Sequence, residues 1–356
     1  MITQEGGSDH SHEPAAPTTP DTWRRLYDLA AQVRSMEPWL WMEETDVFGV
    51  EDAGSDETVF VSVMGLLGEY HAIAVYPGAK ALMQFWQMQN APDRETIADM
   101  LSGIHHAHAA FGKKSDLERE EKERIETLGL KFKGANAWPY FRSFRPGWCP
   151  WMVDAQEARW LILALEQLLD VAPRVQKNRR ILGSGGPEHP YLVRVHSAVD
   201  AQSAWHDTHK PCPPPATTFR ITVSNSLLDA VRAMEPSGLT IELDVTPSFM
   251  PVGKKGARPQ TPYLMMAVES ASGFILGVEL LTVEGALEDL WAQIPGKFLE
   301  MVKRNQVRPA GLALRTPWVF MVMEGLCKNL DIEVKPDPEL QALTQARRSL
   351  DRFNRR

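Results

Sequence analysis

The chain has 356 residues, of which 24% are charged and 44% hydrophobic, and its formal net charge is −8 at pH 7. This length is sufficient for two packed domains, and the composition is ordinary for a globular protein. The acidic balance argues against a generally basic surface that would bind nucleic acid or a membrane. The longest apolar stretch, residues 264–281, contains two glutamates and predicts two strands around a turn, which argues against a membrane partner.

Residues 1–20 have neither an apolar core nor a leading basic cluster, so they do not resemble a signal peptide. Their Gly, Ser, Pro and Thr content predicts a disordered tail. The three cysteines are odd in number and widely spaced, which favours a reducing compartment over a disulfide framework. We therefore expect a cytoplasmic protein.

An N-terminal α+β domain is predicted over residues 21–196 and begins with an amphipathic helix. Asp21 or Thr22 can cap this helix, and apolar residues recur at helical spacing as far as Val33. Three strands follow, over residues 46–50, 59–64 and 71–76. A helix then opens at PGAKALMQFWQ, and the alternating charges of residues 113–129 predict a solvated helical insertion.

Turn-rich and proline-rich segments end this domain. ILGSGGPEHP favours turns, HKPCPPPATT favours an extended chain, and a strand is predicted between them at 191–196. The sequence thus predicts a Pro-rich linker over residues 197–217, followed by a C-terminal α/β domain over residues 218–356.

The C-terminal domain has the clearer pattern. Within the predicted strand 239–246, apolar residues alternate with polar ones, so that Leu243 lies on one face and Asp244 on the other. The remaining strands are predicted over residues 263–269, 274–282, 311–315 and 332–335, and the later helices over 284–304, 318–330 and from Pro338. Three strands followed by alternating helices and strands predict a mixed sheet with helices on its faces.

A short string occurs twice, as VRSMEP from Val33 and as VRAMEP from Val231. A gapless alignment of residues 33–48 with 231–246 matches at 8 of 16 positions and pairs Asp46 with Asp244. Helix, proline and strands follow in the same order around both strings, so we predict two related units that arose by internal duplication. The alternative is chance, because amphipathic segments resemble one another.

Residues 239–353, with IELDVTPSF and PYLMMAVESASGFILGVEL, resemble the RNase-H-like fold of integrase and transposase cores. The resemblance places Asp244 at the family's first metal-binding carboxylate and implies a metal-dependent phosphodiester hydrolase. Glu284 or Glu288, together with Glu339, would complete the carboxylate cluster. The family's fourth strand ends in a second Asp, whereas GLALRTP has Arg315 there, so a local ion pair between Asp244 and Arg315 is the alternative.

The whole chain also resembles uncharacterised bacterial proteins that join two domains of unknown function. EPWLWMEETDVFGV, SVMGLLGEY and WPYFRSFRPGWCPW are similar to the first domain, and the pattern of the C-terminal half is similar to the second. This resemblance implies a bacterial protein and supplies no activity.

Two histidine-containing segments raise the question of a metal site. In WHDTHKPC the candidate zinc ligands are His206, His209 and Cys212. A structural zinc site needs four ligands, usually in closely spaced pairs, so we prefer a solvated linker, although His189 or His196 could supply a fourth ligand. HHAHAAF is interpreted as a partly buried helix with His105 and His108 on one face and no acidic neighbour.

The segment AWPYFRSFRPGWCPW, residues 137–151, is the best candidate for ligand binding. The proposed binding residues are Trp138, Arg142, Arg145, Trp148 and Trp151. Flat aromatic faces beside guanidinium groups suit a planar or anionic ligand, a proline-rich peptide or a single-stranded nucleic acid. The alternative is an aromatic core.

No motif predicts a cofactor, since GSGG lacks the Gly-Lys-Ser/Thr ending of a phosphate loop. The sequence therefore favours a non-enzymatic binding or interaction protein, whose partner is a protein or a small anionic ligand. Two alternatives stay open. One is a degenerate metal-dependent hydrolase, and the other is a nucleic-acid adaptor that acts through the five arginines of ARRSLDRFNRR.

Overall fold

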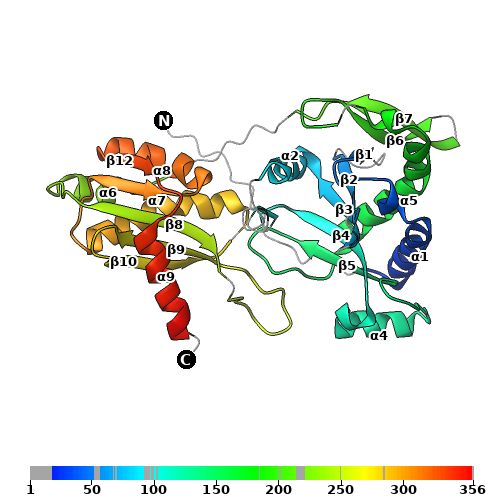
Figure 1. Ribbon diagram of the computed structural model, residues 1–356, viewed down its shortest axis with the longest axis horizontal. Helices are drawn as coiled ribbons and strands as arrows, with labels where there is room; N and C mark the ends of the chain where they lie inside the picture. The colour runs from blue at the N-terminus through cyan, green and yellow to red at the C-terminus, as the bar shows by residue number, and fades with distance from the viewer. Residues whose placement is uncertain are drawn as a thin grey trace, which may run out of the picture. The chain divides into compact units, whose positions relative to one another are not determined.

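A computed structural model describes most of the chain. The described residues are 18–51, 57–66, 68, 70–91, 97, 100–101, 103–183, 185–199, 202–213, 221–248, 250–283 and 285–354. The chain divides into two compact units (Figure 1). Unit 1 comprises Met1–Arg145 and Pro150–Ala216, and unit 2 comprises Pro146–Cys149 and Thr217–Arg356.

Unit 1 contains a seven-stranded sheet in the order β5-β4-β3-β2-β1-β6-β7. Its strands are β1 (Phe48–Glu51), β2 (Val59–Met64), β3 (His71–Pro77), β4 (His106–Gly112), β5 (Trp138–Phe144), β6 (Tyr191–Val199) and β7 (Gln202–Lys210). Neighbouring strands are antiparallel except β1 and β6, which are parallel. Its helices include α1 (Pro20–Met36), α2 (Gly78–Gln89), α4 (Arg119–Thr127) and α5 (Ala155–Lys177).

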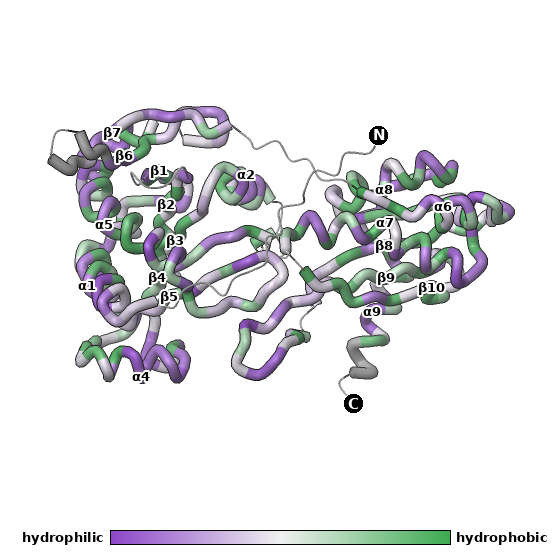
Figure 2. The backbone as a smooth tube through the Cα atoms, turned by 180° about the vertical axis from the view of Figure 1, so that it is seen from behind, coloured by the Kyte–Doolittle hydropathy of each residue, from purple (hydrophilic) through white to green (hydrophobic). Residues whose placement is uncertain are grey.

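Helices cover both faces of this sheet. The first face packs against α1 and α5, whose apolar sides meet Val61 and Ile73 in the larger core. The second face packs against α2, where Phe60 and Tyr76 meet Phe85. The strands separate α2 from α1 and α5 (Figure 1). The charged helix α4, within the predicted insertion, is mostly hydrophilic (Figure 2).

Helix α1 begins within the segment that was predicted as a disordered N-terminal tail. The Thr19 hydroxyl accepts a hydrogen bond from the backbone N–H of Thr22, and Pro20 occupies the first turn. Both features favour a helix N-terminus. The prediction of a tail as far as residue 20 is therefore wrong for residues 19 and 20, and residues 1–17 lie outside the described part of the chain.

Unit 2 contains a five-stranded sheet in the order β10-β9-β8-β11-β12. Its elements are α6 (Asn225–Arg232), β8 (Thr240–Pro247), β9 (Tyr263–Glu269), β10 (Ile275–Leu281), α7 (Leu287–Arg304), β11 (Gly311–Leu314), α8 (Pro317–Asn329), β12 (Glu333–Pro336) and α9 (Gln341–Asn354). The first three strands are antiparallel, and β11 and β12 continue the sheet in parallel with β8. This is the predicted RNase-H-like strand order.

The alternation predicted for β8 is also confirmed. Ile241 and Leu243 lie in the core beneath α6, α7 and α8, and their polar neighbours face the side that α9 covers. There the buried Glu242 carboxylate accepts hydrogen bonds from the backbone N–H groups of Ala342 (3.3 Å) and Leu343 (2.7 Å). A carboxylate at a helix N-terminus is favourable, so this contact fixes α9 on the sheet.

Two secondary-structure predictions are wrong. Residues 202–210 of the predicted linker form β7, which pairs with β6 along its whole length. An edge strand has one partner and tolerates a polar sequence, so WHDTHK gave no strand signal. HHAHAAF, residues 105–111, was predicted as a helix, but residues 106–112 form β4. The period of two in this strand places Ala107 and Ala109 in the first-face core and His106 and His108 on the second face.

The predicted duplication is withdrawn. Asp46 lies in the loop before β1, whereas Asp244 lies within β8. The helices also differ: α1 packs against α5 on the face opposite α2, whereas α6 packs against α7 on one face of unit 2. The strand order β3-β2-β1-β6 of unit 1 is similar to the order β10-β9-β8-β11 of unit 2, but the helices do not pack in equivalent places around the two sheets.

Candidate functional site

The position that carries metal-binding carboxylates in RNase-H-like cores contains an ion pair here. Strand β11 runs beside β8 with Leu314 paired to Leu243, so the next residue, Arg315, reaches Asp244. The guanidinium pairs with one oxygen of this buried carboxylate, and the Thr316 hydroxyl donates to the other at 3.2 Å. A cation in this place opposes metal binding.

The other proposed carboxylates do not complete a cluster. Glu288 lies in the first turn of α7, a helix that packs on the core face of the sheet, whereas Asp244 lies on the other face. Glu339 is exposed and accepts a hydrogen bond from Gln341 at 2.8 Å. Glu284 is outside the described residues. Among those described, no group of three or more His, Cys, Asp or Glu is placed to hold a metal ion.

The candidate zinc ligands are separated by the geometry of β7. His206 and His209 are three residues apart on a strand, so their side chains point to opposite faces. His209 Nε2 contacts the backbone oxygen of Ile181 at 3.0 Å, and Cys212 lies beyond the end of the strand. The structure therefore does not bring these three residues together.

The arginines of the aromatic segment are paired with carboxylates. Arg142 forms a two-pronged ion pair with the buried Glu121 of α4. Arg145 pairs with Asp154 and, through Nε at 3.0 Å, with Glu157 of α5. Neither charge is available for an anionic ligand without breaking these contacts.

The tryptophans of that segment are also divided. Trp138 packs against Phe132, with ring centroids 5.8 Å apart, and Trp151 exchanges backbone hydrogen bonds with Ser143 in unit 1. Trp148 belongs to unit 2, where it forms a bridge with Gln260. Binding by all five predicted residues stays a prediction, and their local contacts are those of packing residues.

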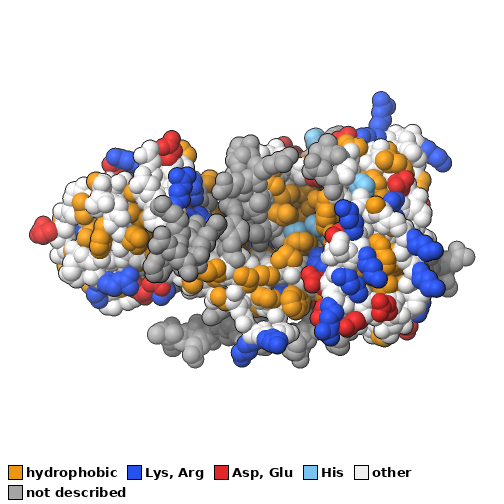
Figure 3. Space-filling model, turned by 60° about the horizontal axis from the view of Figure 1, so that its bottom comes forward, with side chains coloured by type: hydrophobic (Ala, Val, Ile, Leu, Met, Phe, Trp, Pro, Cys, Tyr) orange, Lys and Arg blue, Asp and Glu red, His pale blue; other side chains and the backbone are white. Residues whose placement is uncertain are grey.

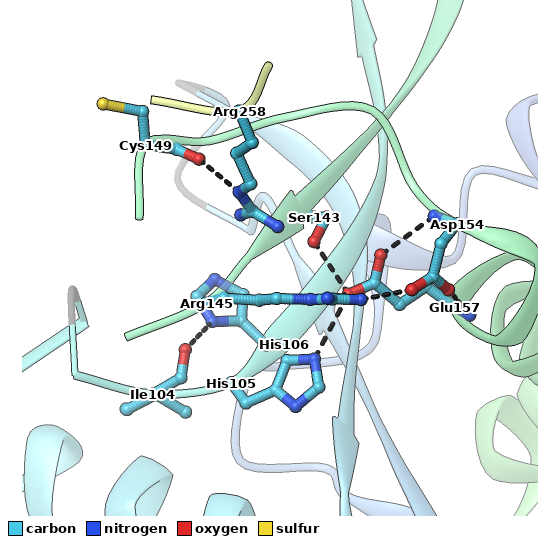
Figure 4. A network of polar contacts seen from close by, with 9 residues as sticks. All are labelled: Ile104, His105, His106, Ser143, Arg145, Cys149, Asp154, Glu157 and Arg258. Atoms are coloured by element: carbon cyan, nitrogen blue, oxygen red, sulfur yellow. Dashed lines mark hydrogen bonds and ion pairs between the residues drawn. The ribbon is translucent and has the colours of Figure 1, made fainter. Parts of the chain in front are cut away.

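Glu157 organises a polar network that sequence reasoning missed (Figure 4). Its Oε1 accepts hydrogen bonds from the Ser143 hydroxyl (2.7 Å) and from Arg145, and it lies 3.2 Å from His105 Nε2. Its Oε2 accepts from the backbone N–H of Asp154 in a capping box at the start of α5. The D-x-x-E spacing of Asp154 and Glu157 was the available signal.

This network resembles a catalytic triad in composition but not in geometry. Ser143 and His105 both contact Oε1 of Glu157, whereas in a triad the histidine lies between the hydroxyl and the carboxylate. The hydrogen bonds and the Arg145 charge outweigh burial and lower the pKa of Glu157 to about 2. The carboxylate is therefore a fixed anion that joins α5 to β5.

The depressed pKa predicts acid sensitivity of unit 1. Because folded Glu157 stays ionised to about pH 2 and an unfolded glutamate titrates near 4.5, its stabilising effect is full above pH 4.5. We expect about 3 kcal/mol of unfolding free energy to be lost as the pH falls from 4.5 to 2. Urea denaturation at pH 6, 4 and 3 measures this loss, and a Glu157→Gln variant should show a shallower pH dependence over the same interval.

A groove on the second face of unit 1 was not predicted either. Two adjoining cavities, of about 480 and 540 Å³, lie beside α2 and share residues 211–213 as a common wall. Phe60 and Val193 line the first cavity, and Met83 and Trp86 line the second. These volumes are in the range of small-molecule sites. We call this pair of cavities the α2 groove.

Unit 2 thus has the strand order and strand directions of the RNase-H-like fold, with an ion pair between Asp244 and Arg315. Residues 23–194 match a family described as a domain of unknown function (DUF7309), and residues 228–351 match a second domain of unknown function (DUF6930). No curated protein matches the chain. Among solved structures, the catalytic core domain of BIV integrase is 20% identical with a TM-score of 0.23, over 32% of this chain and 67% of that chain.

Proposed function

We propose that this is a non-enzymatic binding protein of the bacterial cytoplasm, with the α2 groove as its ligand site. The observation that carries the non-enzymatic part is the Arg315–Asp244 ion pair, which puts a cation where a hydrolase of this fold needs a metal. Among the described residues, no helix is long and apolar enough to cross a membrane.

The lining of the groove supports binding of an apolar ligand with a neutral or cationic end. Trp86 is held in place because its indole N–H donates to the Tyr191 hydroxyl at 2.8 Å, so its ring is a fixed apolar wall. At the other end, Lys210 pairs with Glu51. Glu57 and Glu188 also line the cavities, and Lys210 of the lining is already paired. An anionic ligand would have to break this pair, which disfavours the small anionic ligand predicted from the sequence.

A fragment screen tests the binding site. Fragments with a flat apolar ring and an amine are added to ¹⁵N-labelled protein, and the indole signal of Trp86 is assigned from a Trp86→Phe variant. We expect a subset of fragments to shift this signal, and a Cys212→Trp variant, which fills the shared wall, to abolish the shift. The Cys212→Ser variant is the matched control and should bind normally. If Cys212→Trp binds as well as Cys212→Ser, the groove is not the site.

A nuclease assay tests the non-enzymatic part. The protein is incubated with single- and double-stranded DNA and RNA in the presence of Mg²⁺ or Mn²⁺. We expect no cleavage above that of an Asp244→Asn variant. Metal-dependent cleavage that disappears in Asp244→Asn would contradict the proposal, because it would mean that the Asp244–Arg315 pair opens to admit a metal.

The nucleic-acid adaptor has less support. On the face drawn in Figure 3, Lys and Arg side chains are interspersed with Asp and Glu, without a broad area of positive charge. Sequence-independent nucleic-acid binding depends on such an area. The side chains of residues 351–356, which include three of the five C-terminal arginines, lie outside the described part of the chain, so this alternative stays a prediction.

A further inference from the structure

Strand β10 forms one edge of the unit 2 sheet and presents apolar side chains there. Among the described residues, β9 is its one neighbouring strand. Ile275, Val278 and Leu280 are 37%, 38% and 51% exposed. They lie opposite residues of β9 that belong to the face covered by α9. An edge strand with exposed apolar side chains favours pairing with a strand of another chain.

The other three edge strands of the two sheets have features that oppose such pairing. Strand β12 is four residues long and ends in Lys335 and Pro336. Strand β7 is polar, and β5 exchanges backbone hydrogen bonds with Trp151. Short length, lysine, proline and charged side chains are usual ways of protecting an edge. In β10 a bulge interrupts the edge once, and the strand then continues from Gly277 to Leu281.

The hydrogen-bond pattern gives Val278 outward-pointing backbone groups. The Glu269 N–H donates to the Phe274 oxygen at 2.8 Å, so Glu269 faces β10. Every second residue of an antiparallel strand faces the same neighbour, and Met265 therefore faces its partner Glu279. The adjoining residue, Val278, then points its N–H and C=O away from the sheet, where they suit a further strand.

Two charged side chains beside this edge have no ion-pair partner among the residues that the structure describes. Glu279 lies on the α7 face of β10, opposite Met265 of the core. Arg304, at the end of α7, donates to the backbone oxygen of Leu276 at 3.3 Å. Its Nη2 lies 2.8 Å from the place that a Cβ on Gly277 would occupy, so the guanidinium covers Gly277. An acid and a base thus lie on one face of the edge, at positions 279 and 277.

We propose that β10 is a dimerisation edge, which pairs antiparallel with β10 of a second copy of this chain around a two-fold axis at Val278. In this register Val278 meets Val278 of the second copy, and Glu279 lies opposite Gly277 of the second copy. Because Arg304 covers Gly277, each Glu279 carboxylate meets the Arg304 guanidinium of the other copy. A two-fold axis at Glu279 would instead place two carboxylates opposite each other, which is destabilising.

This charge complementarity selects a second copy as the partner. The edge supplies both members of the ion pair, so a two-fold axis forms the pair twice. A strand of another protein would need its own cation opposite Glu279 and its own anion opposite Gly277. Pairing of one strand makes a small interface, and interfaces below about 1,200 Å² are usually weak or transient. We therefore expect a reversible dimer.

Analytical ultracentrifugation of the full chain, at low ionic strength and over a range of protein concentrations, tests the dimer. We expect the wild-type protein to show a reversible monomer–dimer equilibrium. Glu279→Arg and Arg304→Glu should each weaken it at least tenfold, because like charges then lie opposite each other. The double variant Glu279→Arg/Arg304→Glu should regain the wild-type association. Lys303→Glu, the same charge change on the adjacent exposed residue of α7, is the matched control and should dimerise normally.

Cross-linking tests the register independently. A Val278→Cys variant in a Cys149→Ser/Cys212→Ser background should be joined by a short bismaleimide, because the two Cα atoms at position 278 would lie about 5.5 Å apart. The control is Phe274→Cys in the same background. Phe274 is 58% exposed, but its two copies would lie more than about 20 Å apart along the paired strands.

Four results overturn the proposal, provided that circular dichroism shows each variant to be folded. They are a wild-type protein that stays monomeric at every concentration, a dimer that Glu279→Arg leaves unchanged, a double variant that does not regain association, and equal cross-linking at positions 278 and 274. An ion pair between Glu279 and Arg304 within one copy would not produce any of the expected changes in oligomeric state.

Discussion

Replacement of Leu243 by Asp is expected to unfold unit 2. Leu243 is 0% exposed in the central strand β8, within the core that α6, α7 and α8 cover. The variant loses the packing of the leucine and places a carboxylate within a cluster of buried apolar side chains. We expect the free energy of unfolding to fall by about 5 kcal/mol or more, which is comparable with the whole stability of a domain.

Thermal denaturation followed by circular dichroism measures this effect. Leu239→Asp is the matched control, because Leu239 is the first residue of the predicted strand 239–246 but is 37% exposed just before β8. We expect the control to melt within a few degrees of the wild-type protein. If both variants melt like the wild type, Leu243 does not lie in the core.

Replacement of Glu157 by Ala is expected to produce the second large effect, in unit 1. The change removes the acceptor of the buried Ser143 hydroxyl and leaves Arg145 without one of its two carboxylates. Breaking a buried ion pair by removing one partner costs about 3–5 kcal/mol. Urea denaturation of unit 1 should show a loss of that size, with unit 2 unchanged.

Glu166→Ala is the control for this prediction. Glu166 lies on the same helix, α5, but pairs with Arg25 at the surface, where an ion pair contributes only about 0.2–1 kcal/mol. The comparison therefore separates the effect of burial from that of losing a glutamate. Equal losses in both variants would show that the Glu157 network does not stabilise α5 against β5.

Unit 2 could be predicted because its signals are local. The alternation of Ile241 and Leu243 with Glu242 and Asp244 gives the strand and its buried face directly. The order of strands and helices then leaves few topologies. The ion pair of Asp244 with Arg315 was an alternative that the sequence kept open, and the adjacent, parallel packing of β8 and β11 brings the two residues together.

The sites of unit 1 could not be predicted in the same way. HHAHAAF reads as a helix because alanine favours helices, but β3 and β5 on either side make it a strand. A helix would place His105 and His108 on the same face, whereas the strand places His106 and His108 on the same face. Likewise, the sequence predicted Arg142 as a ligand-binding residue, but in the structure α4 places the Glu121 carboxylate beside its guanidinium group.

The sequence by itself determined the two-part α/β organisation, the RNase-H-like strand order and the absence of a complete carboxylate motif, because hydrophobic period and motif spacing are properties of neighbouring residues. The tertiary structure alone decided which charges are neutralised, which histidines share a face and where the α2 groove lies. These properties depend on pairs such as Arg142 with Glu121 and Trp86 with Tyr191, which are 21 and 105 residues apart in the chain. Only folding brings such groups into contact, and their desolvation then determines pKa, charge and ligand preference.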